Sequence, residues 1–130
     1  MRLIKLSFNK LKICSKATVR LSILKGRTGL TPNILCRIGF CLSLGDPSIP
    51  NPEKYDDNGQ EFNRYTLTGE LDALFIAVMK ERLIHDKLNL KENLIPQFRA
   101  HINRGAISLF DKVKHIEDIN ELLQISKKIK

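Results

Sequence analysis

Apolar residues recur at helical spacing along most of this chain, which restricts it to a fold built mainly of helices. The clearest segment follows Thr68, where six apolar residues share one face: Leu71, Leu74, Phe75, Val78, Met79 and Leu83. Residues 93–113, with Pro96 early in them, and residues 116–129 show the same pattern. Since 42% of the 130 residues are hydrophobic, one sizeable core can be buried. We therefore predict a mainly α fold in one compact domain.

The front of the chain adds a short strand before two helices. Residues 10–14 alternate polar and apolar, as a half-buried strand does. Ser15 can cap a helix that ends at Gly26, and Thr31-Pro32 can start a second helix that stops at Gly45. Strand, helix, turn and helix in this order are typical of ribbon-helix-helix proteins, in which two chains pair their strands. We expect about three further helices after this part.

The chain divides into four parts by composition. Residues 1–9 form a basic N-terminal extension, and residues 10–45 form the ribbon-helix-helix-like part. Residues 46–61 contain three prolines and the sequence Asp-Asp-Asn-Gly, so we expect an irregular connection there. Residues 62–130 form the helical part, which makes 10–130 a single domain.

Positive charge is concentrated at the front of the chain. Residues 1–45 contain nine Lys and Arg and no carboxylate, whereas the remainder has thirteen basic and fourteen acidic residues. Such a local surplus is typical of a surface that binds nucleic-acid phosphates. A solvated basic face without a partner, or a surface for an acidic protein, is the alternative interpretation.

The candidate DNA-contacting residues follow from this layout. They lie on the strand, on the first helix, in the turn and in the first part of the second helix. The amides at the start of the second helix can also hold a phosphate. The candidates are Lys10, Lys12, Lys16, Lys25, Arg27, Thr31, Asn33 and Arg37. Gly26 and Gly29 permit a left-handed turn or close approach to another chain. A second possible set comprises Arg64, Tyr65, Arg99, His101 and Arg104. These arginines could instead pair with acids such as Glu61 and Glu70 and serve only the core.

No pattern in the sequence predicts catalysis, a metal or a cofactor. His85, His101 and His115 lack the spacing of metal ligands, and no phosphate-binding loop is present. The three cysteines, Cys14, Cys36 and Cys41, lie among apolar residues and predict buried thiols. Without a secretory or membrane-spanning pattern, we expect a cytoplasmic protein.

Three segments resemble the DndE family of bacterial DNA sulphur-modification proteins: Leu24–Asn33, Gly59–Glu70 and Phe98–Gly105. The resemblance implies an accessory subunit of DNA phosphorothioation, linked to restriction-modification and defence. It further implies binding to duplex DNA, nicked duplex especially, assembly into a homotetramer, and the partner subunits DndC and DndD. Lys25 and Arg27 would lie at the DNA face, and Gly26 and Gly29 would serve helix crossing or assembly.

Two other function classes remain open at this point. A ribbon-helix-helix repressor would read an operator sequence, and a small nicking or sulphur-handling enzyme would need a metal or an essential cysteine. We expect a non-catalytic DNA-binding subunit. Residues 1–9 lie outside the resemblance and could be an arm, an added strand or the product of an upstream start codon.

Overall fold

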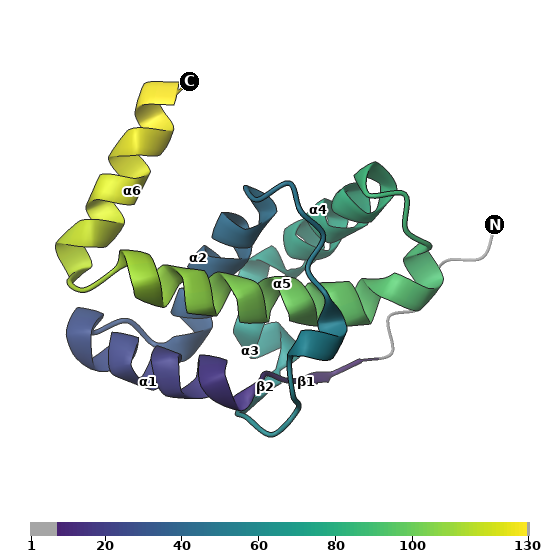
Figure 1. Cartoon of the computed structure of the whole chain (residues 1–130), viewed down its shortest axis with the longest axis horizontal. Helices are drawn as coiled ribbons and strands as arrows, with labels where there is room; N and C mark the ends of the chain where they lie inside the picture. Colours follow the sequence, from purple (N-terminus) through teal and green to yellow (C-terminus); the bar gives the residue numbers. More distant parts are fainter. Residues whose placement is uncertain (1–7, 130) are drawn as a thin grey trace.

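The computed structural model describes residues 8–129, with side chains described through residue 122. Its elements are β1 (Lys10–Lys12), α1 (Ser15–Thr28), α2 (Pro32–Leu44), a 3-10 turn (Pro52–Lys54), β2 (Glu61–Asn63), α3 (Arg64–Thr68), a second 3-10 turn (Gly69–Leu71), α4 (Asp72–His85), α5 (Leu90–Lys112) and α6 (Ile116–Ile129). The mainly α prediction is confirmed. In Figure 1, α5 runs through the centre of the molecule, α1 lies below it, and α6 projects from its end.

The first strand finds its partner within the same chain. β1 pairs antiparallel with β2, so that Leu11 lies opposite Phe62 and both are buried. The expectation that a second copy supplies the partner strand is therefore wrong for the described residues. Sequence alone could not reveal this pairing, because about fifty residues separate two strands of only three residues each.

Part of the proposed N-terminal extension belongs to the domain. Residues 1–7 lie outside the described residues, but Phe8 is buried and its ring centroid lies 6.0 Å from that of Phe98. The Asn9 carbonyl accepts a hydrogen bond from the Arg64 backbone amide. Phe8 and Asn9, which the prediction assigned to the extension, therefore pack with the domain.

The boundaries of α1 differ from the predicted ones at both ends. α1 continues through Gly26 to Thr28 and ends at Gly29, whose φ of 77° is left-handed and suits glycine. Cys14, and not Ser15, caps this helix, since its Sγ accepts a hydrogen bond from the Ala17 amide. The predicted start of α2 at Pro32 and its stop before Gly45 are confirmed.

In the second half of the chain, Thr68 ends α3 instead of capping the long helix that follows. α4 starts only at Asp72. Leu71, before the helix, and Leu74, within it, are exposed, although their spacing predicts a buried face. α5 begins at Leu90, about three residues earlier than predicted, where the Asn89 side chain caps it. α6 has the predicted bounds.

The core is built around the crossing of α2 and α5. α5 also packs against α1 and α4, and Phe40 of α2 stacks at 5.2 Å on Phe98 of α5. At the crossing point Gly39 and Gly105 bring the two backbones together: a Cβ on Gly39 would lie 2.7 Å from the Gly105 carbonyl carbon, and one on Gly105 would overlap the Gly39 carbonyl. Only glycine permits so close an approach.

We predict that Gly105→Ala lowers the free energy of unfolding by about 3 kcal/mol or more, because the helices must move apart to admit the methyl group. Urea unfolding followed by circular dichroism measures the change. Gly26→Ala is the matched control, since Gly26 is helical and nothing lies within 4 Å of an added Cβ. It should be neutral or stabilising by about 0.5 kcal/mol. Equal stability of the two variants would contradict the close crossing.

Candidate nucleic-acid interface

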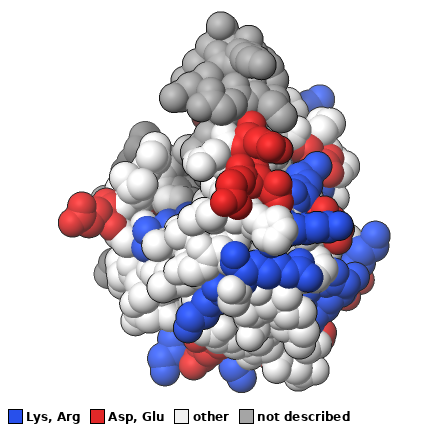
Figure 2. Space-filling model, turned by 90° about the vertical axis from the view of Figure 1, so that its left-hand side faces the viewer, with Lys and Arg blue, Asp and Glu red and all other residues white. Residues whose placement is uncertain are grey.

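Helix α1 carries the largest group of exposed basic side chains in the front of the chain. Ala17, Leu21, Leu24 and Thr28 point into the core, and this orientation leaves the basic residues at the surface. Lys16, Lys25 and Arg27 are exposed, and Arg20 is half-buried. Figure 2 views the molecule from the side on which α1 ends, and shows Lys and Arg spread over the middle and lower part of this face. The main acidic group lies above them, next to the grey atoms.

The two arginines of α1 are held in place by the end of α5. The guanidinium carbons of Arg20 and Arg27 lie 4.4 Å and 5.0 Å from the centroid of the Phe110 ring. Arg20 also lies 3.8 Å from the Asp111 carboxylate, which is itself largely exposed. Stacking on an aromatic face restricts a guanidinium without using its N–H donors, so Arg27 remains able to bind a phosphate.

The ribbon presents a mixed polar face beside α1. Lys10 and Lys12 are exposed and lie directly opposite Asn63 and Glu61 of β2. Residues opposite each other in an antiparallel pair share one face of the ribbon. The Glu61 carboxylate therefore offsets part of the positive charge that the sequence assigned to this strand.

The start of α2 borders a groove of about 240 Å³, lined by Pro32, Asn33, Gln60, Glu61, Phe62, Asn63 and Thr66. Thr31 precedes the helix, but its side chain makes no capping hydrogen bond to the backbone. Its hydroxyl donates instead to Asn33 Oδ1, while Asn33 Nδ2 donates to the Thr66 carbonyl. Both residues thus lie where predicted, and Asn33 is already engaged within the chain.

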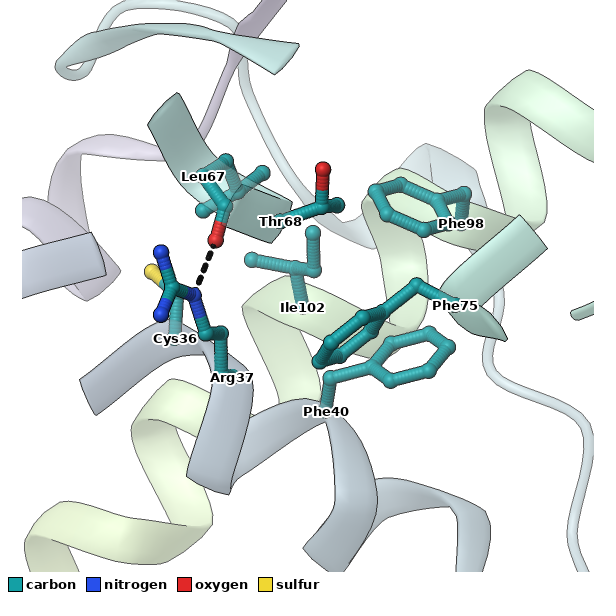
Figure 3. A pocket seen from close by; sticks show the side chains of 8 residues that line it. All are labelled: Cys36, Arg37, Phe40, Leu67, Thr68, Phe75, Phe98 and Ile102. Atoms are coloured by element: carbon teal, nitrogen blue, oxygen red, sulfur yellow. Dashed lines mark hydrogen bonds between the residues drawn. The ribbon is translucent and has the colours of Figure 1, made fainter. Parts of the chain in front are cut away.

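Arg37, another predicted DNA-contacting residue, has a clear structural role. Its Nε donates to the Leu67 carbonyl at 2.7 Å (Figure 3). Its Nη2 donates to the Thr66 carbonyl at 3.0 Å. These bonds satisfy the end of α3 and attach it to α2. A Cβ on Gly69, whose φ is 63°, would lie 2.8 Å from the same guanidinium.

In the second predicted set, Arg64 serves the core. It is buried, and its Nη2 lies 2.7 Å from an Asp72 carboxylate oxygen. The hydrogen bonds from Arg64 hold the pKa of Asp72 below its usual value. The same guanidinium lies 4.9 Å from the ring centroids of Phe8 and Tyr65. It is thus enclosed by the chain, whereas Tyr65 itself is exposed.

Arg99 has a structural role as well. It donates to the backbone carbonyls of Lys12 and, at 3.1 Å, Tyr55. Both arginines thus contact their own chain, as the structural interpretation expects, but neither pairs with Glu61 or Glu70. Arg64 pairs with a different acid, Asp72, and Arg99 binds backbone carbonyls, which carry no signal in the sequence.

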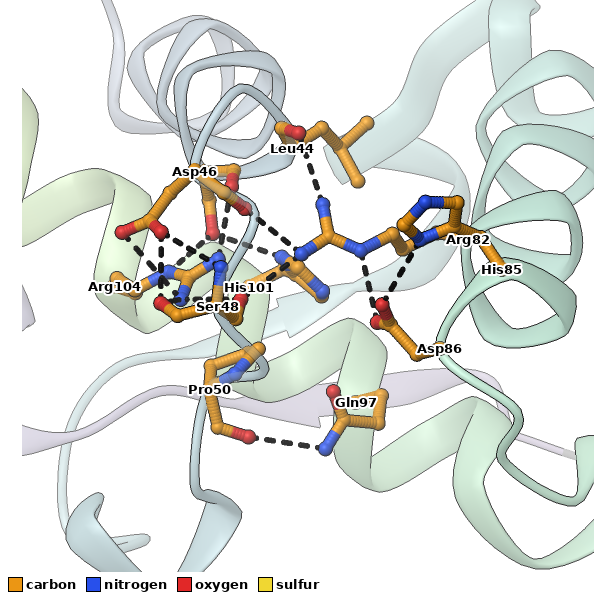
Figure 4. A network of polar contacts seen from close by, with 11 residues as sticks. Leu44, Asp46, Ser48, Pro50, Arg82, His85, Asp86, Gln97, His101 and Arg104 are labelled. Carbon is orange, nitrogen blue, oxygen red and sulfur yellow. Dashed lines mark hydrogen bonds and ion pairs between the residues drawn. The ribbon is translucent and has the colours of Figure 1, made fainter.

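Arg82 is a structural residue that the sequence patterns do not single out. It donates to the carbonyls of Leu44, Asp46 and Ser48 at 2.9, 2.8 and 2.9 Å, and to the Asp86 carboxylate at 2.8 Å (Figure 4). The only signal in the sequence is the spacing of Arg82 and Asp86, which places them one helical turn apart. The segment after α2 is thus firmly attached to α4.

Arg104 of α5 completes the same network from the other side. It donates to the Ser43 hydroxyl and carbonyl at 2.8 Å and to the Ser48 carbonyl at 2.9 Å, and it lies 3.7 Å from Asp46 (Figure 4). His101 is fully buried, with Nδ1 2.8 Å from the Ser43 hydroxyl. Burial lowers the pKa of His101 to about 4, so the ring is neutral near pH 7. These groups hold residues 43–48 against α5.

The prediction of buried thiols is confirmed for two of the three cysteines. Cys14 and Cys36 are buried, and burial raises the pKa of the Cys36 thiol to about 12, but Cys41 is exposed. Among the described residues no three His, Cys, Asp or Glu side chains come together to hold a metal ion. None of the helices in the described part is long and apolar enough to cross a membrane.

Comparison with known proteins gives consistent results. The model of the family described as DNA sulphur modification protein DndE matches residues 10–117. The crystal structure of DndE from Escherichia coli B7A, involved in DNA phosphorothioation modification, is 29% identical with a TM-score of 0.63, over 78% of this chain and 97% of that one. A DndE variant with glycines replaced by lysine, involved in DNA phosphorothioation, is 25% identical with the same TM-score and coverage. No curated protein matches.

We predict that Arg37→Ala lowers the free energy of unfolding by about 2 kcal/mol, because it removes two charge-assisted hydrogen bonds to carbonyls. Lys16→Ala is the control, as Lys16 is exposed on α1, and should change stability by less than about 0.5 kcal/mol. Urea unfolding measures both variants. If Arg37→Ala unfolds like the unchanged protein, Arg37 does not hold α3 in place.

Proposed function

The chain belongs to the DndE family of DNA sulphur modification proteins, and we propose that it acts there as a non-catalytic subunit that binds duplex DNA. Binding is directed at backbone phosphates and favours nicked duplex. The sulphur chemistry then lies in partner subunits such as DndC and DndD. A subunit with this role would act in the cytoplasm, where the DNA lies.

The observation that carries the proposal is the exposed basic surface of α1. Lys16, Lys25 and Arg27 are exposed on a helix that contains no acidic residue, and Arg27 is oriented by Phe110. Long basic side chains on a rigid helix suit phosphate contacts, since each contact releases condensed counterions. Lys10 and Lys12 on the ribbon that precedes α1 are exposed as well.

Self-association into a homotetramer is part of the proposal. α1 exposes Val19 and Ile23, at 59% and 41%, and Gly26 follows them about one turn later. Exposed apolar side chains next to a glycine form a surface on which another copy of the chain could pack closely.

The repressor alternative has no remaining structural support. It depends on a ribbon formed by two chains, and β1 pairs instead with β2 of its own chain. No other observation in the described residues favours sequence-specific operator binding, so we propose only the accessory DNA-binding function.

We predict that the double variant Lys25→Gln and Arg27→Gln weakens binding to duplex DNA and flattens its salt dependence. The slope of log K against log salt should fall by about one unit for each phosphate that the variant no longer neutralises. Fluorescence anisotropy with a labelled duplex at several salt concentrations measures this slope.

Lys87→Gln together with Lys91→Gln is the matched control. Both lysines are exposed in the α4–α5 region, at the opposite end of the molecule from the end of α1 (Figure 1). The control removes the same charge and should retain most of the slope. Equal slopes for the two double variants would show that α1 does not contact DNA.

A further inference from the structure

Polar side chains line the groove between the start of α2 and β2, and they differ in whether they already have hydrogen-bond partners within the chain. Asn33 and Asn63 are engaged: Asn33 with Thr31 and the Thr66 carbonyl, and Asn63 as the cap of α3. No hydrogen bond or ion pair joins the side chains of Gln60 or Glu61 to any other described residue. The groove therefore offers one carboxylate and one primary amide that are available to a ligand.

The charges around the groove select the class of ligand. The Glu61 carboxylate would repel a phosphate, whereas Lys12 directly opposite it, with Lys10 on the same face, would repel a metal cation. A neutral group with hydrogen-bond donors fits both constraints. A nucleobase is such a group, and a phosphate attached to it can lie next to the lysines.

We propose that this groove binds an unpaired guanine of the DNA. Two donors on the Watson–Crick edge of guanine, N1–H and the N2 amino group, match the two oxygens of the Glu61 carboxylate. The Gln60 amide can donate to the O6 acceptor, and the Pro32 ring adds an apolar wall. The volume of about 240 Å³ is large enough for one base.

This inference rests on the proposed DNA binding. It also explains structurally why the protein would bind damaged or nicked duplex more tightly than intact duplex. A base beside a break leaves the stack at a lower cost than a base inside an intact helix. The lysines and α1 would hold the phosphates, while Gln60 and Glu61 would hold the displaced base. Phosphate contacts then supply affinity, and the groove supplies the preference for a break.

The test uses three duplexes of one sequence, each with a single unpaired nucleotide that is guanosine, inosine or an abasic site. Inosine lacks the N2 amino group, and all three have the same number of phosphates. Binding is measured by fluorescence anisotropy at one salt concentration. The unchanged protein should bind the guanosine duplex roughly five- to hundredfold more tightly than the abasic one, with inosine between them.

Glu61→Gln should reduce this preference several-fold, because the amide keeps one acceptor oxygen but replaces the other with a donor that would face a donor of the base. Glu53→Gln is the matched control, because Glu53 is exposed, lies outside the groove and loses the same charge. It should retain the preference. Urea unfolding of Glu61→Gln should be unchanged, because the Glu61 side chain has no partner among the described residues.

Two results would overturn the inference while leaving DNA binding intact: equal affinity of the unchanged protein for the guanosine and abasic duplexes, or a preserved preference in Glu61→Gln. Failure to bind any of the three duplexes would instead remove the proposed function, and the groove assignment with it.

Discussion

The contact between Gly39 and Gly105 determines how the rest of the molecule can be arranged. A side chain at either glycine would meet the backbone of the other helix, so α2 and α5 can approach this closely only with glycine at both positions. α5 then packs against α1 and α4 as well. The basic helix α1 is therefore positioned by a central helix whose distance from α2 is fixed by backbone contact.

Arginine side chains attach the irregular segments to this helical core. Arg82 and Arg104 hold the carbonyls of residues 43–48 from two sides, and Arg99 holds Lys12 and Tyr55. Carbonyl groups in loops need hydrogen-bond partners, and a guanidinium can satisfy several at once. The guanidinium groups of these arginines are occupied within the fold, so the proposed phosphate contacts are assigned to the lysines and to Arg27. The basic residues thus divide into structural and exposed groups that composition alone cannot separate.

Helical periodicity is sufficient to predict most helices, including α2 and α6, because those signals lie within each segment. The β1–β2 pairing, the Gly39–Gly105 contact and the carbonyl partners of Arg37 depend on residues far apart in the chain, and no local pattern encodes them. At Gly26 a local pattern is present but misleading, because the glycine predicts the end of the helix and yet lies inside α1. For the candidate site, charge segregation points to Lys16, Lys25 and Arg27, which are exposed in the structure, whereas the groove beside Glu61 is visible only in the folded chain.

The most direct test compares the affinity of the unchanged protein for intact duplex, nicked duplex and single-stranded DNA of one sequence at two salt concentrations. A surface that holds phosphates on α1 and a displaced base in the groove predicts the tightest binding for nicked duplex, weaker binding for intact duplex, and a decrease of affinity with salt for both. Binding that does not change with salt, or equal affinity for all three DNA forms, would contradict it.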